Sequence, residues 1–99
     1  MIFEIARLTI DPARAADFEA AVARAEPHFR SAAGCTSFAL QRLIEAPGVY
    51  HLVVGWVSVA AHMEDFRASE AYGHWRALAG PFFVAPPVVV HGETVVGGD

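Results

Sequence analysis

The sequence predicts a single α+β domain over residues 1–99, and three observations lead to this fold class. First, 99 residues supply enough apolar side chains for one hydrophobic core and not for two. Second, four segments have the β-rich composition of strands. Third, two regions between them carry helix spacing together with helix start and stop residues. The order strand, helix, strand, strand, helix, strand is that of a ferredoxin-like split βαβ fold with a four-stranded antiparallel sheet.

Residues 2–10 predict the first strand, because apolar side chains occupy both of its alternating faces. Asp11 can cap the helix that follows, and Pro12 suits its first position, where a missing N–H costs nothing. Pro27 is expected to kink this helix and Gly34 to end it. A stripe at helical spacing marks the buried side: Phe18, Val22, Ala25 and Phe29.

Residues 35–44 and 49–57 predict two strands joined as a hairpin. Pro47 and Gly48 between them suit a type II turn, which needs a fixed φ followed by a positive one. The second of these strands is apolar on both faces, as is the first strand of the chain. We therefore expect a sheet that is covered on both sides.

Residues 58–67 and 69–79 predict two short helices, each opening on a serine that can cap its first turn. Gly80 and Pro81 stop the second helix. After a connecting loop, residues 87–96 predict the fourth strand. The helices would then cover one face of the sheet and leave the other face bare.

The composition predicts a homodimer. The chain is 55% hydrophobic, although a domain of this size buries only about 60 to 65% of its unfolded surface. A self-complementary apolar face is the commonest way for a small domain to hide such an excess. We expect two bare sheet faces to pack together as a dimeric α/β barrel.

Charge and motif content argue against several other classes of protein. The net charge is −4, and the seven basic residues form no run, so nucleic-acid binding is not expected. Glu4 and Arg7 interrupt the first apolar run, which argues against a signal peptide, and Gly and Pro break the longer uncharged stretches. We expect a cytoplasmic protein with no membrane span. The lone Cys35 excludes an internal disulfide.

Four stretches resemble the antibiotic biosynthesis monooxygenase (ABM) domain family of small dimeric α/β-barrel proteins. They are "IARLTIDPARAADFEAAV", "GCTSF", "YHLVVGWVS" and "FRASEAY". The resemblance covers nearly the whole chain. It implies a cofactor-independent monooxygenase that acts on a small aromatic or polycyclic phenol or quinol, because members that oxygenate aromatic substrates use neither metal nor flavin.

Two subgroups of that family are a poorer fit. Relatives that degrade haem use an Asn, a Trp and a His at positions that hold Ala6, Phe66 and Arg76 in this chain. Quinol-oxidising relatives often carry histidines where this chain has Asp65 and Ala71. The resemblance therefore implies no haem and no other cofactor, and it leaves the quinol assignment open.

The candidate site residues lie in the second helical region. Oxygenation of a phenol needs a base, a cation or hydrogen-bond donor near the phenolate, and aromatic walls. Tyr72, Trp75 and Arg76 share one helix face, and His62 and Phe66 share another. We expect His62 to act as base and Arg76 to stabilise the phenolate, with Phe66, Tyr72 and Trp75 binding the substrate. The alternative is that these aromatic side chains only fill the core.

A further candidate for substrate binding is His51. It shares a strand face with Gly55, whose missing side chain leaves space for a ligand. His91 could lie near it in the sheet, and either residue could instead be a hydrogen-bonded core or interface histidine. The five histidines show neither an H-x-H nor an H-x-x-x-H spacing, so no metal site is expected.

Two other functions also fit the sequence. One is a non-catalytic dimeric barrel that binds a small hydrophobic ligand, and the other is a cofactorless isomerase on the same scaffold. The monooxygenase and the isomerase each require an ordered polar group inside an apolar cavity, whereas the binding protein does not.

Overall fold

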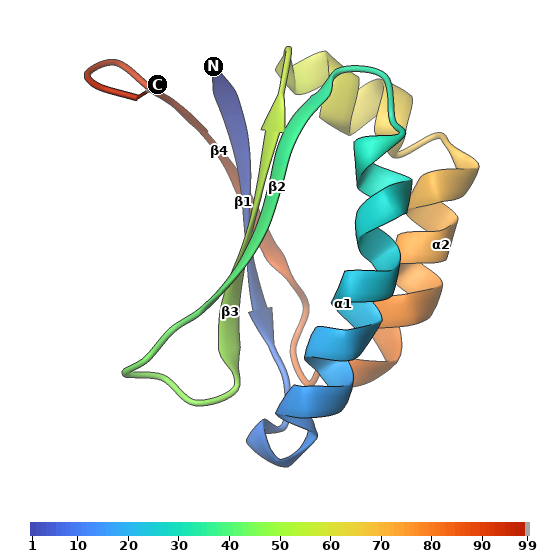
Figure 1. The fold of residues 1–99 in the computed structure, drawn as a ribbon, viewed down its shortest axis with the longest axis vertical. Coiled ribbons are helices and arrows are strands. Elements are labelled where there is room, and N and C mark those ends of the chain that lie inside the picture. Colours follow the sequence, from blue (N-terminus) through green and yellow to red (C-terminus); the bar gives the residue numbers. More distant parts are fainter. Residues whose placement is uncertain (99) are drawn as a thin grey trace.

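The computed structural model describes residues 1–98 and has the expected order of elements (Figure 1). The strands are β1 (Ile2–Thr9), β2 (Cys35–Arg42), β3 (Val49–Trp56) and β4 (Val88–Glu93). The two α-helices are α1 (Ala15–Arg30) and α2 (Glu70–Ala79). Three short helical turns complete the chain: η1 (Pro12–Arg14), η2 (Ala61–Phe66) and η3 (Gly80–Phe82).

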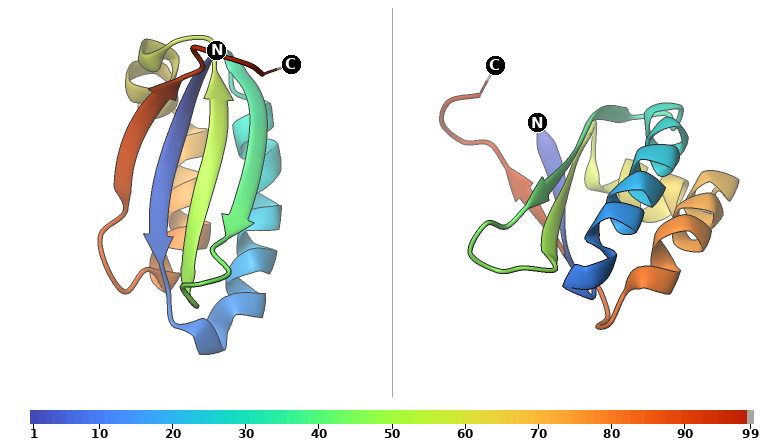
Figure 2. Two further views of the ribbon diagram at one scale, coloured as in Figure 1. Left: turned by 90° about the vertical axis from the view of Figure 1, so that its left-hand side faces the viewer. Right: turned by 60° about the horizontal axis from the view of Figure 1, so that its bottom comes forward.

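The four strands form one antiparallel sheet in the order β2-β3-β1-β4. Both helices pack on the same face of this sheet, and the four strands stand uncovered on the other side (Figures 1 and 2). This arrangement is the ferredoxin-like fold, so the fold class predicted from the sequence is confirmed.

Local sequence signals act mostly as expected at the helix ends. The Asp11 side chain accepts a hydrogen bond from the N–H of Ala13, although the turn it caps is η1 and α1 begins only at Ala15. The Ser69 Oγ accepts from the N–H of Tyr72 at 3.4 Å and caps α2. Gly48, with φ +82°, closes the β2–β3 hairpin in the left-handed conformation that glycine tolerates.

Several element boundaries differ from the sequence-based prediction, among them the end of β2, which stops at Arg42 and not at residue 44. Helix α1 continues through Pro27 and ends at Arg30, before Gly34. The region expected to be a helix over residues 58–67 is a π-helical turn, η2. Strand β4 is shorter than the expected 87–96, because Glu93 already pairs with Ile2 at the start of β1 and the following residues have no strand beside them.

The core lies between the sheet and the helices. It contains alternate residues of the two central strands and the inner faces of both helices, and its largest fully buried side chains are Trp56, Tyr50, Phe18, Phe29, Leu8 and Leu52. The Tyr50 hydroxyl donates to Glu19 at 2.6 Å and so ties β3 to α1. None of the helices in residues 1–98 combines the length and the apolar character that a membrane span needs.

Candidate functional site

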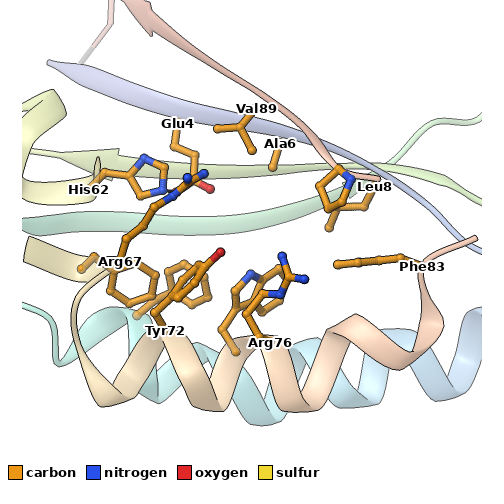
Figure 3. Close-up of a pocket in the computed structure, with 13 residues that line it drawn as sticks. Glu4, Ala6, Leu8, His62, Arg67, Tyr72, Arg76, Phe83 and Val89 are labelled. Carbon is orange, nitrogen blue, oxygen red and sulfur yellow. Dashed lines mark ion pairs between the residues drawn. The ribbon is translucent and has the colours of Figure 1, made fainter. Parts of the chain in front are cut away.

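A cavity of about 160 Å³ lies between the sheet and helix α2 (Figure 3). Strand β1 contributes Glu4, Ala6 and Leu8, which alternate along the strand and therefore share the face that the helices cover. Most of the remaining wall is aromatic or aliphatic: Phe29, Phe66, Trp75, Phe83, Pro87 and Val89. The cavity therefore combines aromatic and aliphatic walls with a group of polar and charged side chains.

Glu4 is the polar group that β1 places in the wall of the cavity. It is only 5% exposed, and its Oε1 accepts a hydrogen bond from the indole N–H of Trp56 at 3.1 Å. His62 Nε2 lies 3.2 Å from the same oxygen. Burial raises the pKa of Glu4 from 4.5 to about 7, against the opposing effects of the Trp56 hydrogen bond and the positive charge of Arg67.

His62 is 2% exposed and packs flat against the indole of Trp56, with ring centroids 5.4 Å apart and an interplanar angle of 17°. Its second ring nitrogen, Nδ1, lies 2.9 Å from Nε2 of His91. Burial lowers the pKa of His62 to about 4, and His91 and Arg67 act in the same direction. At neutral pH the imidazole is therefore uncharged, so its 3.2 Å contact with Glu4 is not an ion pair.

The π-helical turn η2 places His62 in the cavity wall. The Arg67 N–H donates to the carbonyl of His62 at 3.2 Å, which closes the wider turn, and Ser58 Oγ accepts from the N–H of Ala61 at 3.1 Å where the turn begins. Turns of this kind are rare and frequently occur at functional sites. In this chain the turn buries both His62 and Phe66 against the sheet.

Two arginines and a tyrosine stand opposite the carboxyl group. Helix α2 carries Tyr72, Trp75 and Arg76 on one face, and Figure 3 shows the Tyr72 hydroxyl and the Arg76 guanidinium pointing from this helix toward the sheet. Arg67 extends toward Glu4, and its guanidinium carbon lies 5.9 Å from the centre of the Tyr72 ring. Trp75 is buried, whereas Arg67 and Arg76 are exposed over much of their length. The cavity thus has positive charge on the side that is open to solvent.

The structure brings most of the site residues predicted from the sequence around this one cavity: His62, Phe66, Tyr72, Trp75 and Arg76. The exception is His51. It pairs with Arg7 in the β1–β3 ladder and lies on the bare face of the sheet, among Phe3, Ile5 and Val53. His91 lies on the other face, across from Glu4, so the suggested proximity of His51 and His91 is wrong. Strand β1 separates their two strands, and their side chains point to opposite sides.

Glu4 lines the cavity but is not among the site residues predicted from the sequence. A signal was present, because Glu4 alternates with Ala6, Leu8 and Ile10 on a strand face that is otherwise apolar. A carboxyl group at such a position is almost never fully buried unless it has partners. Arg67 was missed as well, and its spacing in the sequence gave no comparable indication.

The polar groups of the cavity do not converge on a metal-binding point. His62 lies between Glu4 and His91 and directs one ring nitrogen toward each of them. Within residues 1–98, no group of three or more His, Cys, Asp or Glu side chains is placed to hold a metal ion.

Comparison with known proteins assigns the chain to a family. The model of the antibiotic biosynthesis monooxygenase family matches residues 1–78, which include Glu4, His62 and Arg76. A Bordetella bronchiseptica crystal structure assigned to these monooxygenases is 50% identical, covers 96% of this chain and 97% of its own, and superposes with a TM-score of 0.93. A similarly assigned structure from Caulobacter crescentus is 25% identical over 96% of this chain and 90% of its own, with a TM-score of 0.82.

The uncharacterized protein YczJ of Bacillus subtilis is 33% identical over 95 residues, which are 96% of this chain and all of YczJ. The family model and the two structures agree with the resemblance seen in the sequence. The chain belongs to the antibiotic biosynthesis monooxygenase (ABM) family.

Proposed function

We propose that the protein is a cofactor-independent monooxygenase that oxidises a small, single-ring phenol with an unsubstituted para carbon, bound in the cavity. The observation that carries this proposal is the buried pair of Glu4 and neutral His62 in the wall of a cavity that also has aromatic walls and two arginines. A base works best when its pKa lies near the working pH, and the pKa of Glu4 is about 7.

Glu4 is the group that takes the proton of the substrate. His62 uses Nε2 toward Glu4 and Nδ1 toward His91, so neither nitrogen is free to reach a ligand. The contacts of Glu4 use Oε1, which leaves Oε2 for the phenol hydroxyl. This proposal alters the assignment made from the sequence: His62 acts through Glu4 and orients it, while Arg76 keeps its role beside the phenolate. Because arginine stays protonated at any working pH, it lowers the pKa of a phenol bound next to it.

The phenolate then reacts with O₂ without a cofactor. One electron passes from the phenolate to O₂, and the phenoxyl radical and superoxide combine to form a C–O bond at the para carbon. The product of this step is a peroxide anion, which takes up one proton from solvent in place of the proton that the phenol lost. Loss of water from the resulting hydroperoxide gives a quinone, so one phenol and one O₂ yield one quinone and one water. The aromatic walls formed by Phe66 and Trp75 keep bulk water away from these intermediates.

The volume of the cavity limits the size of the substrate. An engineered cavity of about 150 Å³ binds benzene, whereas drug-sized ligands occupy about 300 to 1,000 Å³. A volume of about 160 Å³ therefore suits a single ring. This argues for the smaller of the substrate classes considered from the sequence and against a polycyclic phenol.

The two alternatives differ in how well they account for Glu4. A non-catalytic binding protein has no use for a buried carboxyl group, whose desolvation works against folding. A cofactorless isomerase would use the same base to move a proton between two carbon atoms. Only the monooxygenase consumes oxygen, so oxygen uptake distinguishes it from both alternatives.

Oxygen uptake with 2-methylphenol tests the proposal. We expect uptake above the buffer rate, one O₂ per quinone formed, and a lower rate with the two-ring 1-naphthol. Glu4→Gln should reduce the rate by about 10²-fold or more, and Arg76→Leu by about 10²-fold, because each removes one group that acts on the phenolate. Glu93→Gln, an exposed carboxylate on β4, is the matched control and should keep the wild-type rate. Absence of uptake with a panel of single-ring phenols would show the proposal to be wrong.

A further inference from the structure

A continuous chain of hydrogen-bonding groups leads from the cavity to the edge of the sheet. Glu4 Oε1 lies 3.2 Å from His62 Nε2, and His62 Nδ1 lies 2.9 Å from His91 Nε2. The second contact is a hydrogen bond, and the first lies within the distance at which one can form. The imidazole of His62 therefore connects a carboxyl group in the cavity with a second imidazole on the edge strand β4.

The fold holds all three groups in place. Glu4 and His91 are directly opposite each other in the β1–β4 ladder, so both side chains point to the helix side of the sheet. His62 reaches them from η2 and stacks on the indole of Trp56. That same indole donates its N–H to Glu4, so one side chain orients both the carboxyl group and the central imidazole.

The two ends of the chain differ in their exposure to solvent. Glu4 and His62 are almost fully buried, at 5% and 2% exposed, whereas His91 is only partly buried. His91 is therefore the member that can exchange a proton with water on the β4 side. Glu4 is the member that reaches the cavity.

The position of the proton fixes the direction of both hydrogen bonds. When Glu4 is protonated, it donates to Nε2 of His62, which then carries its own proton on Nδ1 and donates to His91. When Glu4 is a carboxylate, it accepts from Nε2–H of His62, whose Nδ1 accepts from His91. A proton that Oε2 takes from the phenol reaches His62 after the carboxyl group turns and exchanges its two oxygens. Reversing the direction then moves one proton from Glu4 to His91, which becomes an imidazolium and releases the proton on its other nitrogen to solvent, while His62 stays neutral in both states.

We infer that Glu4, His62 and His91 form a proton wire that carries the proton taken from a bound phenol out of the cavity to solvent at the edge of β4. The phenol rests on the proposed function, but the wire is a property of the ligand-free protein. His91 is then a relay residue that never touches the substrate.

The charged groups around the wire disfavour the protonated, charged form of His62. Arg67 disfavours a charged His62, and the low pKa of about 4 means that His62 passes a proton on without retaining it. From α2, Arg76 and Tyr72 face the cavity, and neither contacts His62 or His91 by a hydrogen bond or ion pair within residues 1–98. On the β2 side, burial raises the pKa of the Cys35 thiol, and Glu4 adds to this rise, so the thiol stays protonated and does not compete for the proton.

Histidine ¹⁵N NMR tests the wire in the ligand-free protein. As the pH rises through about 7, Glu4 loses its proton, and His62 should change from the Nδ1–H to the Nε2–H tautomer in the same titration. In Glu4→Gln this change should disappear, because residue 4 then no longer titrates. A single His62 tautomer in wild-type protein from about pH 5 to pH 9 would overturn the inference.

A kinetic experiment tests the part played by His91. After a rapid pH jump, the infrared band of the protonated Glu4 carboxyl should decay about 10²-fold more slowly in His91→Gln than in wild type, because glutamine keeps a hydrogen bond but does not carry a proton. Added imidazole should restore the rate in His91→Ala. His74→Gln, an exposed histidine on α2, is the control and should relax at the wild-type rate.

Equal relaxation rates in His91→Gln and wild type would show that the proton leaves by another route, and the wire would be wrong. Neither experiment uses oxygen or a phenol. A tautomer change without oxygen uptake would therefore contradict the proposed function alone, whereas oxygen uptake without a tautomer change would contradict the wire alone.

Discussion

Glu4 and His62 are each held in the state that burial favours, and their effects on stability oppose each other. The pKa of Glu4 is raised from 4.5 to about 7, so its contribution to stability is fully present below 4.5 and is lost as the pH rises through about 7. The pKa of His62 is lowered from 6.5 to about 4, so its contribution is present above 6.5 and is lost as the pH falls through about 4. Between 4.5 and 6.5, the stability that Glu4 loses as the pH rises is therefore largely offset by the stability that His62 gains.

Replacing Glu4 by glutamine should reveal this balance. The rise in the pKa of Glu4 corresponds to about 3 kcal/mol. The free energy of unfolding of Glu4→Gln, relative to wild type, should therefore increase by about this amount between about pH 4 and about pH 8. Urea denaturation at the two pH values measures it, with Glu93→Gln as control. A difference between variant and wild type that is the same at both pH values would contradict the burial of a titrating carboxyl group.

At the scale of single residues, the sequence predicts the apolar and aromatic part of the site better than its polar part. The i, i+3 and i+4 spacing of Tyr72, Trp75 and Arg76 is a local property, so their shared face can be read directly. The partners of Glu4 are more than fifty residues away along the chain, at Trp56 and His62. Nothing local to residue 4 indicates that a tryptophan and a histidine meet there.

Among the elements, η2 has the greatest influence on the site, because it sets where His62 lies. Its first turn depends on the hydrogen bond from the Ala61 N–H to the Ser58 hydroxyl. Ser58→Ala should lower the free energy of unfolding by about 1 kcal/mol, the usual effect of losing a serine cap. It should also reduce oxygen uptake, because a looser turn no longer holds His62 against Glu4.

The matched control for this experiment is Ser69→Ala, which removes the cap of α2 and leaves η2 intact. Denaturation and oxygen uptake are measured on both variants. If Ser58→Ala lowers stability but leaves uptake unchanged, the exact placement of His62 by η2 is not needed for function.

The extent of each element is predictable where the signal is local and unpredictable where it depends on a neighbour. The Gly48 turn and the Ser58 and Ser69 caps follow from sequence alone. The end of β4 does not, because it is set by where β1 begins. Likewise, alternation correctly places His51 and Val53 on one face of β3. It does not tell which face of the sheet the helices cover, and therefore not that the face with His51 is bare.

At the scale of the whole molecule, the bare face of the sheet exposes apolar side chains to solvent. Phe3, Ile5 and Val53 lie on it, and β4 adds Val88 and Val90, which are 59% and 53% exposed. An antiparallel sheet in water normally shows polar side chains on its open face. We propose that a second copy of the chain covers this face, as the sequence analysis expected, so that two sheets form one barrel.

Sedimentation analysis at low micromolar concentration checks this proposal. Wild-type protein should sediment as a dimer, and Ile5→Glu, which places a charge opposite Val53 at the centre of the face, should shift it to a monomer. Val59→Glu, an exposed valine outside the sheet, is the control and should remain dimeric. Wild-type protein that sediments only as a monomer would contradict the proposal.

If the cavity holds a carboxyl group that takes up a proton near neutral pH, the titration of Glu4 itself will show it. The carboxyl carbon of Glu4 can be followed by ¹³C NMR across a pH titration of the ligand-free protein, with Glu4→Gln to assign the signal. We expect a midpoint near the pKa of about 7. A midpoint at the ordinary glutamate value of 4.5 would contradict it.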